Sequence, residues 1–265
     1  MAPRRILLAE DSLVNQRVAV GFLTKWGHQV VIANHGREAV EHWRREPFDV
    51  VLMDVQMPEM NGYDATAAIR REEQGTGRRT PIVAMTAEAM KGDREHCLAA
   101  GMDDYLSKPI DAESLFRVVA SFPAKVLAAA APALVAEQVT VPAKAATPAN
   151  IEPSSDHDVI DWDAARKNTG NDAKLLDELV HIFLDECPHT MTEIRQAIAT
   201  SDAVLLRRSA HTLKGSAAIF GAQPVVDAAL RLEMMGRENN LASAADGLER
   251  LESRTTRLLE VIQRN

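Results

Sequence analysis

Polar side chains follow four short apolar runs in the first half of the chain. Glu10 and Asp11 follow "ILLA", Asp54 follows "VVLM", Thr86 follows "IVAM" and Lys108 follows "YLS". Carboxylates, a hydroxyl and an ammonium group in one place would bind a hard divalent cation and stabilise a phosphoryl group. They meet only if the apolar runs are strands that end at the same edge of a sheet.

The apolar runs predict a parallel sheet. They are apolar at every position, which is typical of strands that are buried on both faces. Segments of about 10–15 residues with helical periodicity separate them, as in βαβ units. We therefore expect an α/β domain with five helices and five strands, the strands lying near residues 6–9, 30–32, 50–53, 82–85 and 105–107.

The strand order decides which carboxylates meet. In a doubly wound sheet of order 2-1-3-4-5 the first and third strands are neighbours, so Glu10, Asp11 and Asp54 converge at the carboxyl edge. Three adjacent carboxylates do not all stay ionised without a positive partner, which favours a bound Mg²⁺. Asp54 would then accept a phosphoryl group, with Lys108 neutralising its oxygens and Thr86 donating a hydrogen bond to one of them.

This half of the chain resembles the response-regulator receiver domain. The motifs "AED" (9–11), "LMDVQMPEMNG" (52–62), "AMTA" (84–87) and "DDYLSKPI" (103–110) occur in the order found in that family, and the resemblance covers nearly all of residues 4–122. It implies a flavodoxin-like (βα)5 fold with strand order 2-1-3-4-5, and a Mg²⁺-dependent phosphorylation of Asp54.

The resemblance also implies roles for further residues. Asp11 would bind Mg²⁺ directly, Glu10 through water and Gln56 through its backbone carbonyl. The peptide bond before Pro109 is expected to be cis. Thr86 and Tyr105 are expected to move together as a switch when Asp54 is phosphorylated.

The second half of the chain predicts an all-α domain. From about residue 159 no strand pattern occurs, and apolar residues recur at steps of three and four, as in a bundle of four long helices with a short opening helix. Residues 123–157 are rich in Ala and Pro, which is typical of a linker. We expect a receiver domain at 1–122, a linker at 123–157 and a bundle at 158–265.

The stretch "AHTLKGSAAIFGA" (210–222) contains the second candidate site. On a helix, His211 lies opposite the apolar stripe and is expected to face solvent, beside Lys214 and Gly215. A Gly inside a helix is about 1 kcal/mol less favourable than Ala. A bare patch beside an imidazole suits a partner that approaches very closely, and Lys214 would screen a phosphoryl group on the ring.

This stretch resembles the histidine phosphotransfer (HPt) domain. That family has His-x-x-Lys-Gly on the second long helix of a four-helix bundle, followed by a Gly where Gly221 stands. The resemblance implies that His211 carries a phosphoryl group on its exposed ring nitrogen, with no catalytic machinery of its own. A receiver domain followed by an HPt domain resembles the C-terminal part of hybrid sensor histidine kinases.

These features predict an intermediate of a two-component phosphorelay. Asp54 would accept a phosphoryl group from a phosphohistidine on an upstream sensor kinase, and His211 would carry it to or from an aspartate on another receiver. A linker of roughly 33 residues spans about 30 Å, which permits contact between the receiver and the bundle within one chain. The sequence leaves open the direction of flow, and whether the chain is free-standing or part of a hybrid kinase.

An alternative function is a binding switch that phosphorylation of Asp54 controls, with the bundle as a dimerisation module. A third possibility, a transcriptional output, is not favoured, because no helix-turn-helix with basic recognition residues is present. An autonomous ATP-dependent kinase is not expected, because no Gly-rich motif such as GxxxxGKS/T is present. We therefore expect a phosphotransfer protein, although a parent hybrid protein would be a histidine kinase.

Composition limits the partners and the compartment. The formal net charge is −8 and no block of Lys and Arg occurs, which argues against nucleic acid and anionic membranes. No apolar stretch reaches the roughly 18 residues of a membrane span, so a cytoplasmic location without membrane contact is expected. Cys97 and Cys187 lack the spacing of a zinc site and are expected to be reduced thiols.

Overall fold

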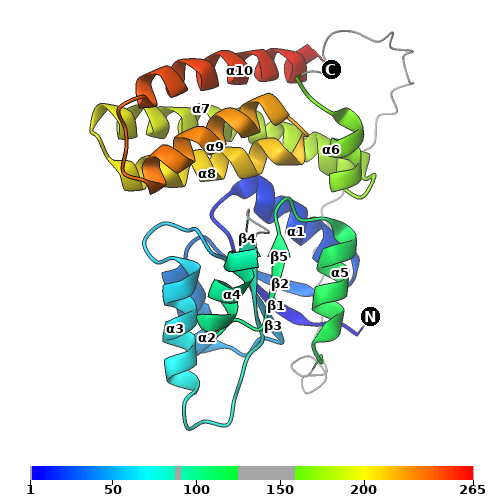
Figure 1. Ribbon diagram of the computed structural model, residues 1–265. Helices are drawn as coiled ribbons and strands as arrows, with labels where there is room; N and C mark the ends of the chain where they lie inside the picture. Colours follow the sequence, from blue (N-terminus) through cyan, green and yellow to red (C-terminus); the bar gives the residue numbers. More distant parts are fainter. Residues whose placement is uncertain (1, 87–90, 125–158, 265) are drawn as a thin grey trace.

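The computed structural model describes residues 2–86, 91–124 and 159–264. The predicted linker at 123–157 lies outside the described residues except for its first two. Figure 1 shows an α/β domain with a helical bundle stacked against one end of it. The predicted pairing of an α/β domain with an all-α domain is therefore confirmed.

The sheet has five parallel strands in the order β2-β1-β3-β4-β5. Its strands are β1 (Arg5–Ala9), β2 (Gln29–Ala33), β3 (Val50–Asp54), β4 (Ile82–Thr86) and β5 (Asp104–Ser107). The predicted strand order is confirmed, and it places the carboxyl ends of β1 and β3 side by side. Burial on both faces holds for β1 and β3 but is wrong for β2, an edge strand where Ile32 remains 38% exposed.

Helices cover both faces of the sheet. They are α1 (Leu13–Lys25), α2 (Gly36–Arg45), α3 (Gly62–Glu73), α4 (Lys91–Ala99) and α5 (Ala112–Ser121). Apolar residues of α1 and α5 pack on one face, and those of α2, α3 and α4 on the other. Side-chain caps start α1 and α5, where Ser12 and Asp111 accept backbone N–H groups of the first turn.

The second domain has the predicted short helix followed by four long ones. They are α6 (Trp162–Asn168), α7 (Ala173–Ala199), α8 (Ala203–Ile219), α9 (Gln223–Arg237) and α10 (Ala244–Arg264). An Asp caps each of the first three helices, at Asp161, Asp172 and Asp202. These side chains satisfy backbone donors that a helix start leaves unpaired.

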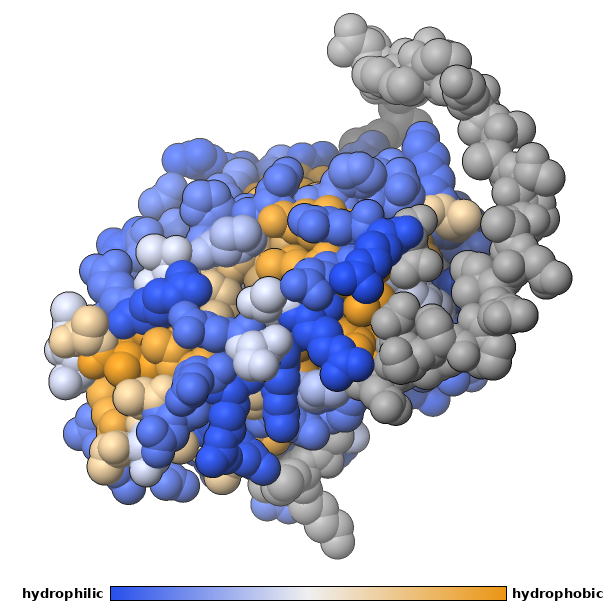
Figure 2. All heavy atoms as spheres, turned by 90° about the horizontal axis from the view of Figure 1, so that it is seen from above, coloured by the Kyte–Doolittle hydropathy of each residue, from blue (hydrophilic) through white to orange (hydrophobic). Residues whose placement is uncertain are grey.

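The bundle packs around an aromatic pair. The rings of Phe183 on α7 and Phe220, at the end of α8, are 5.1 Å apart and fully buried. Gly221 follows with φ +62°, and a Cβ there would lie 2.7 Å from the Cβ of Asp161, so the turn after α8 requires glycine. Seen from the bundle side, the outer surface is mainly hydrophilic, with hydrophobic groups showing between the polar ones (Figure 2).

Helix α1 lies between the sheet and the bundle (Figure 1). Its buried residues join the sheet core to that of the bundle in one continuous hydrophobic cluster. The carboxyl edge of the sheet therefore faces α8 and α9 of the bundle. Among the described residues, no helix is both long enough and apolar enough to cross a membrane.

The aromatic pair generates a stability prediction. Phe183→Ala removes a fully buried ring and should lower the free energy of unfolding of the bundle by about 3–5 kcal/mol. Val204→Ala, on an 80% exposed side chain of α8, should change it by less than about 0.5 kcal/mol. Urea unfolding followed by circular dichroism measures both, and equal effects would contradict the packing described here.

Candidate functional site

Three carboxylates meet at the carboxyl edge of the sheet. Glu10 and Asp11 follow β1, and Asp54 is the last residue of β3. The two strands are paired with Ala9 opposite Met53, so the residues that follow are neighbours. Oxygen atoms of the three side chains lie within 4.8 Å of one another. The structure thus brings together the acidic residues that the sequence predicted to converge.

Lys108 lies between two of these carboxylates. Its Nζ is 2.6 Å from Asp54 Oδ2 and 2.6 Å from Glu10 Oε2. Burial alone would lower the pKa of Lys108, but the two carboxylates outweigh it and raise the pKa. Lys108 is therefore a fixed positive charge. The peptide bond between Lys108 and Pro109 is cis, as the sequence motif implied.

The other oxygen of each carboxylate is also held in place. Asp54 Oδ1 accepts a hydrogen bond of 3.0 Å from the backbone N–H of Gln56, and Glu10 Oε1 accepts one of 3.0 Å from Asn15 Nδ2. Gly62 lies so close to β3 that a Cβ would be 2.2 Å from the carbonyl oxygen of Asp54. Glycine at this position lets the loop after β3 fold back against the strand end.

Lys108 alone does not balance the negative charge of the three carboxylates in the acidic cluster. Burial raises the pKa of Asp54 to about 7, with Lys108 opposing and Glu10 adding to the rise. Burial and the charge of Glu10 likewise raise the pKa of Asp11 to about 6. A set of oxygen donors that holds excess negative charge in a buried place fits a hard divalent cation.

Thr86 and Tyr105 lie at the same edge. Thr86 ends β4, directly after Met85, which is paired with Asp54, and Tyr105 on β5 is paired with Ala84. Both side chains are partly buried. The guanidinium of Arg94 on α4 lies 5.9 Å from the centre of the Tyr105 ring. The joint movement of Thr86 and Tyr105 stays a prediction.

His211 on α8 is buried, and the expectation that it faces solvent is wrong. Its side chain is only 4% exposed. The reason is that the receiver half covers this helix face: Gly215, one turn further along, lies where a Cβ would be 3.1 Å from Asn15 Nδ2 on α1. His211 lies near enough to Asp54 for a protonated imidazole to oppose the rise in the pKa of that carboxyl.

Glu233 on α9 holds the imidazole. Its Oε1 lies 2.7 Å from His211 Nδ1, and its Oε2 accepts a hydrogen bond of 2.5 Å from Lys214 Nζ. Burial alone would raise the pKa of Glu233, but His211 and Lys214 outweigh it and lower the pKa to about 2. An ionised carboxylate only accepts hydrogen bonds, so Nδ1 of His211 is the donor. The lone pair of the neutral ring is then on Nε2.

Small polar residues join the two halves around these groups. Thr212 Oγ1 on α8 donates a hydrogen bond of 3.3 Å to Asp11 Oδ2, and the hydroxyls of Ser216 and Ser12 are 3.0 Å apart. Gln56 Nε2 lies 3.5 Å from Glu233 Oε1. The bundle thus contacts the acidic cluster directly, as the bare patch at Gly215 suggested.

Sequence reasoning missed Glu233 and the hydroxyls of Thr212 and Ser216. A signal for Glu233 was present, because it is a charged residue among the buried apolar positions of α9, between Ala229 and Gly236. Such a residue needs a buried partner. Thr212 and Ser216 carried no comparable signal, since hydroxyls are common on exposed helix faces.

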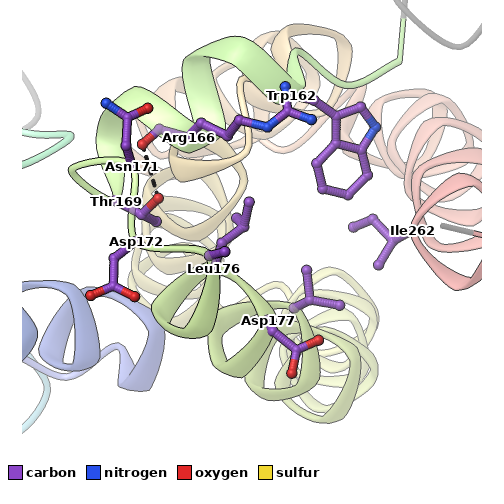
Figure 3. Close-up of a pocket in the computed structure, with 10 residues that line it drawn as sticks. Trp162, Arg166, Thr169, Asn171, Asp172, Leu176, Asp177 and Ile262 are labelled. Atoms are coloured by element: carbon purple, nitrogen blue, oxygen red, sulfur yellow. Dashed lines mark hydrogen bonds between the residues drawn. The ribbon is translucent and has the colours of Figure 1, made fainter. Parts of the chain in front are cut away.

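A separate cavity of about 580 Å³ lies in the bundle, away from these groups. Trp162 and Arg166 from α6, Leu176 and Asp177 from α7, and Ile262 from α10 line it (Figure 3). Its lining includes none of the residues of the acidic cluster and not His211. It is distinct from the candidate site.

Comparison with protein families defines the class of each half. Residues 6–120 match the response regulator receiver domain family, and residues 178–261 match the Hpt domain family. The chain therefore carries a receiver domain followed by an Hpt domain, as its motifs implied.

Known relatives are sensor histidine kinases. The chain is 30% identical, over 96% of its length, to sensor histidine kinase GacS of Pseudomonas protegens, of which it covers 26%. It is 42% identical, over 45% of its length, to hybrid signal transduction histidine kinase I of Dictyostelium discoideum, of which it covers 7%. The chain thus spans about a quarter or less of the length of these relatives.

Two solved structures resemble the receiver half. One is the receiver domain of a sensor histidine kinase from Pseudomonas aeruginosa with a magnesium ion in its active site cleft, at 45% identity and TM-score 0.42 over 46% of this chain and 98% of that one. The other is a chain from a complex of a histidine phosphotransfer protein with a receiver domain from Saccharomyces cerevisiae, at 31% identity and TM-score 0.42 over 44% of this chain and 87% of the matched chain.

The contact with Glu233 predicts the tautomer of His211. In the unaltered protein, ¹⁵N NMR should show the proton of neutral His211 mainly on Nδ1, because the Glu233 carboxylate accepts it. Glu233→Gln removes the charge and should give a mixture of tautomers. The matched change Glu238→Gln, at an exposed position after α9, should leave the spectrum unaltered. An unchanged tautomer in Glu233→Gln would contradict this assignment.

The close approach at Gly215 predicts two opposite effects of one substitution, a more stable bundle and a weaker contact between the domains. Gly215→Leu should raise the free energy of unfolding of the bundle by up to about 1 kcal/mol, because Leu favours helix over Gly. It should also separate the domains, since even a Cβ would be 3.1 Å from Asn15. Thermal unfolding and small-angle scattering measure the two effects. A stabilised bundle that stays docked would contradict the prediction.

Proposed function

We propose that this chain is a phosphorelay intermediate in which Asp54 and His211 exchange a phosphoryl group. The observation that carries the proposal is the arrangement of both residues at one interface. Asp54 is held by Lys108 beside two further carboxylates, and His211 is held by Glu233 with Nε2 as its basic nitrogen. The receiver and Hpt families of the two halves support the same role.

The first step loads Asp54. A carboxylate oxygen of Asp54 attacks the phosphorus of a phosphohistidine on a sensor kinase, the P–N bond breaks, and the imidazole leaves with the electron pair. Lys108, 2.6 Å from Asp54 Oδ2, neutralises negative charge on the transferred group. Thr86 donates a hydrogen bond to another of its oxygens. In the second step Nε2 of His211 attacks the acyl phosphate, and the Asp54 carboxylate leaves.

The donor set fits a magnesium ion, held by Asp11 and Asp54 directly, by Glu10 through water and by the backbone carbonyl of Gln56. When bound, this cation supplies charge neutralisation at the phosphoryl oxygens. Such an ion would stabilise the ionised forms of Asp54 and Asp11, whose pKa values are raised by burial and by the charge of Glu10.

The remaining groups either respond to phosphorylation of Asp54 or assist phosphorylation of His211. Thr86 and Tyr105 form a switch that reports phosphorylation to the surface near α4 and β5. On the bundle, Lys214 screens the phosphoryl group on His211, and Gly215 lets the receiver approach closely. Glu233 keeps the proton on Nδ1 and thereby keeps Nε2 available.

The partners follow from this chemistry. An upstream sensor histidine kinase supplies the phosphoryl group, and a downstream response-regulator receiver exchanges it with His211. We place the chain in the cytoplasm, where such partners have access to it. Relatives that are longer sensor kinases support the assignment to the relay part of a hybrid histidine kinase.

Three changes test this function. Asp54→Ala, or removal of Mg²⁺ with a chelator, should abolish loading of His211 by a phosphorylated kinase, because Asp54 is the obligatory first acceptor. His211→Gln should allow loading of Asp54 but stop transfer to the downstream receiver. A phosphotransfer time course with labelled kinase measures each step.

The controls separate this function from its main rival. Undiminished labelling of His211 in Asp54→Ala would contradict the order of the relay. If Asp54 acted only as a binding switch, the downstream output would persist in His211→Gln, and the phosphorelay proposal would fail. Exposed His181, which the relay does not use, serves as the matched position for a His→Gln control.

A further inference from the structure

The two domains touch at a second place that the chemistry does not use. Along α1, Ser12 and Asn15 lie at the candidate site, whereas Arg17, Gly21, Phe22 and Lys25 face the corner of α6 and α7. At 1.5 Å per residue, Arg17 lies about 3 Å and Lys25 about 15 Å further along α1 than Asn15. We call these four α1 residues and the four bundle residues that meet them the anchor surface; the latter are Gly170, Asp172, Leu175 and Glu178.

Two ion pairs join the receiver and the bundle at the anchor surface. Arg17 Nε donates a hydrogen bond of 2.7 Å to Glu178 Oε2, and a second nitrogen of Arg17 contacts the same oxygen. Lys25 Nζ lies 3.7 Å from Asp172 Oδ2. The receiver contributes both positive charges and the bundle both negative charges, so the two surfaces are complementary.

Asp172 has two contacts that fix its direction. Its Oδ1 caps α7 by accepting from the backbone N–H of Leu175, which leaves Oδ2 for Lys25. Figure 3 shows Asp172 pointing away from the bundle cavity toward the blue helix α1. Because a change at Asp172 would also remove a helix cap, it is unsuitable for a test.

The centre of the anchor surface is apolar and close. A Cβ on Gly21 would lie 3.0 Å from Leu175 Cδ2, so the Leu175 side chain rests on the bare backbone of α1. On the other side, a Cβ on Gly170 would lie 3.0 Å from Phe22 Cε1. At these two points each domain thus has a glycine where the other has a large apolar side chain. The anchor residues also line an open groove of about 440 Å³ between the domains.

We propose that the anchor surface recognises the chain's own bundle and holds the molecule in a closed form that shields both phosphoacceptors. Asp54 and His211 are 1% and 4% exposed, and contacts between the domains lie beside both, from Thr212 to Asp11 and from Gln56 to Glu233. In the closed form transfer between Asp54 and His211 is favoured, and access from outside is blocked. The anchor must release before a kinase reaches Asp54 or another receiver reaches His211. This inference rests on the proposed function for its transfer arm only.

A contact of this kind is suited to reversible closure. Partly exposed ion pairs are weak individually, and two domains in one chain meet at a high effective concentration. A modest contact then keeps most molecules closed while allowing frequent opening. Arg17 and Glu178 pair with each other and not with Lys108, Glu233 or the acidic cluster. Changing this pair therefore alters closure while the residues that hold the phosphoacceptors keep their own contacts.

Charge reversal tests the proposal in the full chain. Arg17→Glu and Glu178→Arg, each alone, should raise the rate of carbethoxylation of His211 by diethyl pyrocarbonate roughly three- to tenfold, since each turns an attraction into a repulsion. Peptide mass spectrometry reads His211 against the exposed His181 in the same sample. The double change restores the pair with reversed sign and should return the rate toward that of the unaltered chain.

A second measurement follows two phosphoryl-transfer rates, which should change in opposite directions. In the same single variants, transfer from Asp54 to His211 within one chain should slow several-fold, while loading of Asp54 by acetyl phosphate in a His211→Gln background should become faster. A purely structural defect would slow both. Arg45→Glu on α2, which pairs with Glu41 on its own helix, is the matched control and should change neither.

Different outcomes would contradict the anchor and the proposed phosphorelay function. Unchanged carbethoxylation of His211 in both single variants, or no restoration in the double variant, would overturn the anchor, whatever the phosphoryl chemistry. If carbethoxylation responds as expected but Asp54 accepts no phosphoryl group, the anchor stands and the proposed function fails.

Discussion

The receiver half depends on one buried arrangement, the ammonium of Lys108 held between Asp54 and Glu10. Buried carboxylates are tolerated only with a charged partner close by. The parallel order of β1, β3 and β4 brings the acids together, and β5 delivers the lysine from the other side of β4. The loop that Gly62 allows to fold back completes the site. Removing Lys108 would leave buried negative charge without a fixed partner, so the fold and the chemistry share this constraint.

The bundle likewise uses a buried ion pair to hold its own candidate phosphoacceptor, His211. Lys214 and Glu233 form a buried ion pair, and the second oxygen of the carboxylate orients His211. Around the two phosphoacceptors, the surfaces that join the halves are made of Gly215, hydroxyl groups and one amide, which come close without bringing in a further unpaired charge. Docking therefore places two reactive groups together while each keeps its own neutralising partner.

Sequence patterns predicted the strands to within one or two residues, because five runs of buried apolar residues allow few other arrangements. The acidic cluster and Lys108 were predictable for the same reason, since parallel strands end at one edge. His211 was placed on the correct helix face but judged exposed, because its burial arises from a second domain. Glu233 lies 22 residues after His211. Pairing across helices depends on how they pack, which helical periodicity alone does not determine. The ion pair of Arg17 with Glu178 could not be predicted for the same reason, because it joins helices of two different domains.

The charges at the joined site connect these features. Four carboxylates, those of Glu10, Asp11, Asp54 and Glu233, face two ammonium groups, those of Lys108 and Lys214. With all four carboxylates ionised, negative charge exceeds positive charge by two before any phosphoryl group arrives. Burial is the main cause of the raised pKa values of Asp54 and Asp11, and the charge of Glu10 adds to both. A divalent cation would balance this excess, so its binding and the docking of the bundle should favour each other. Closure by the anchor and cation binding at the carboxyl edge are then two parts of one equilibrium, although they use different residues.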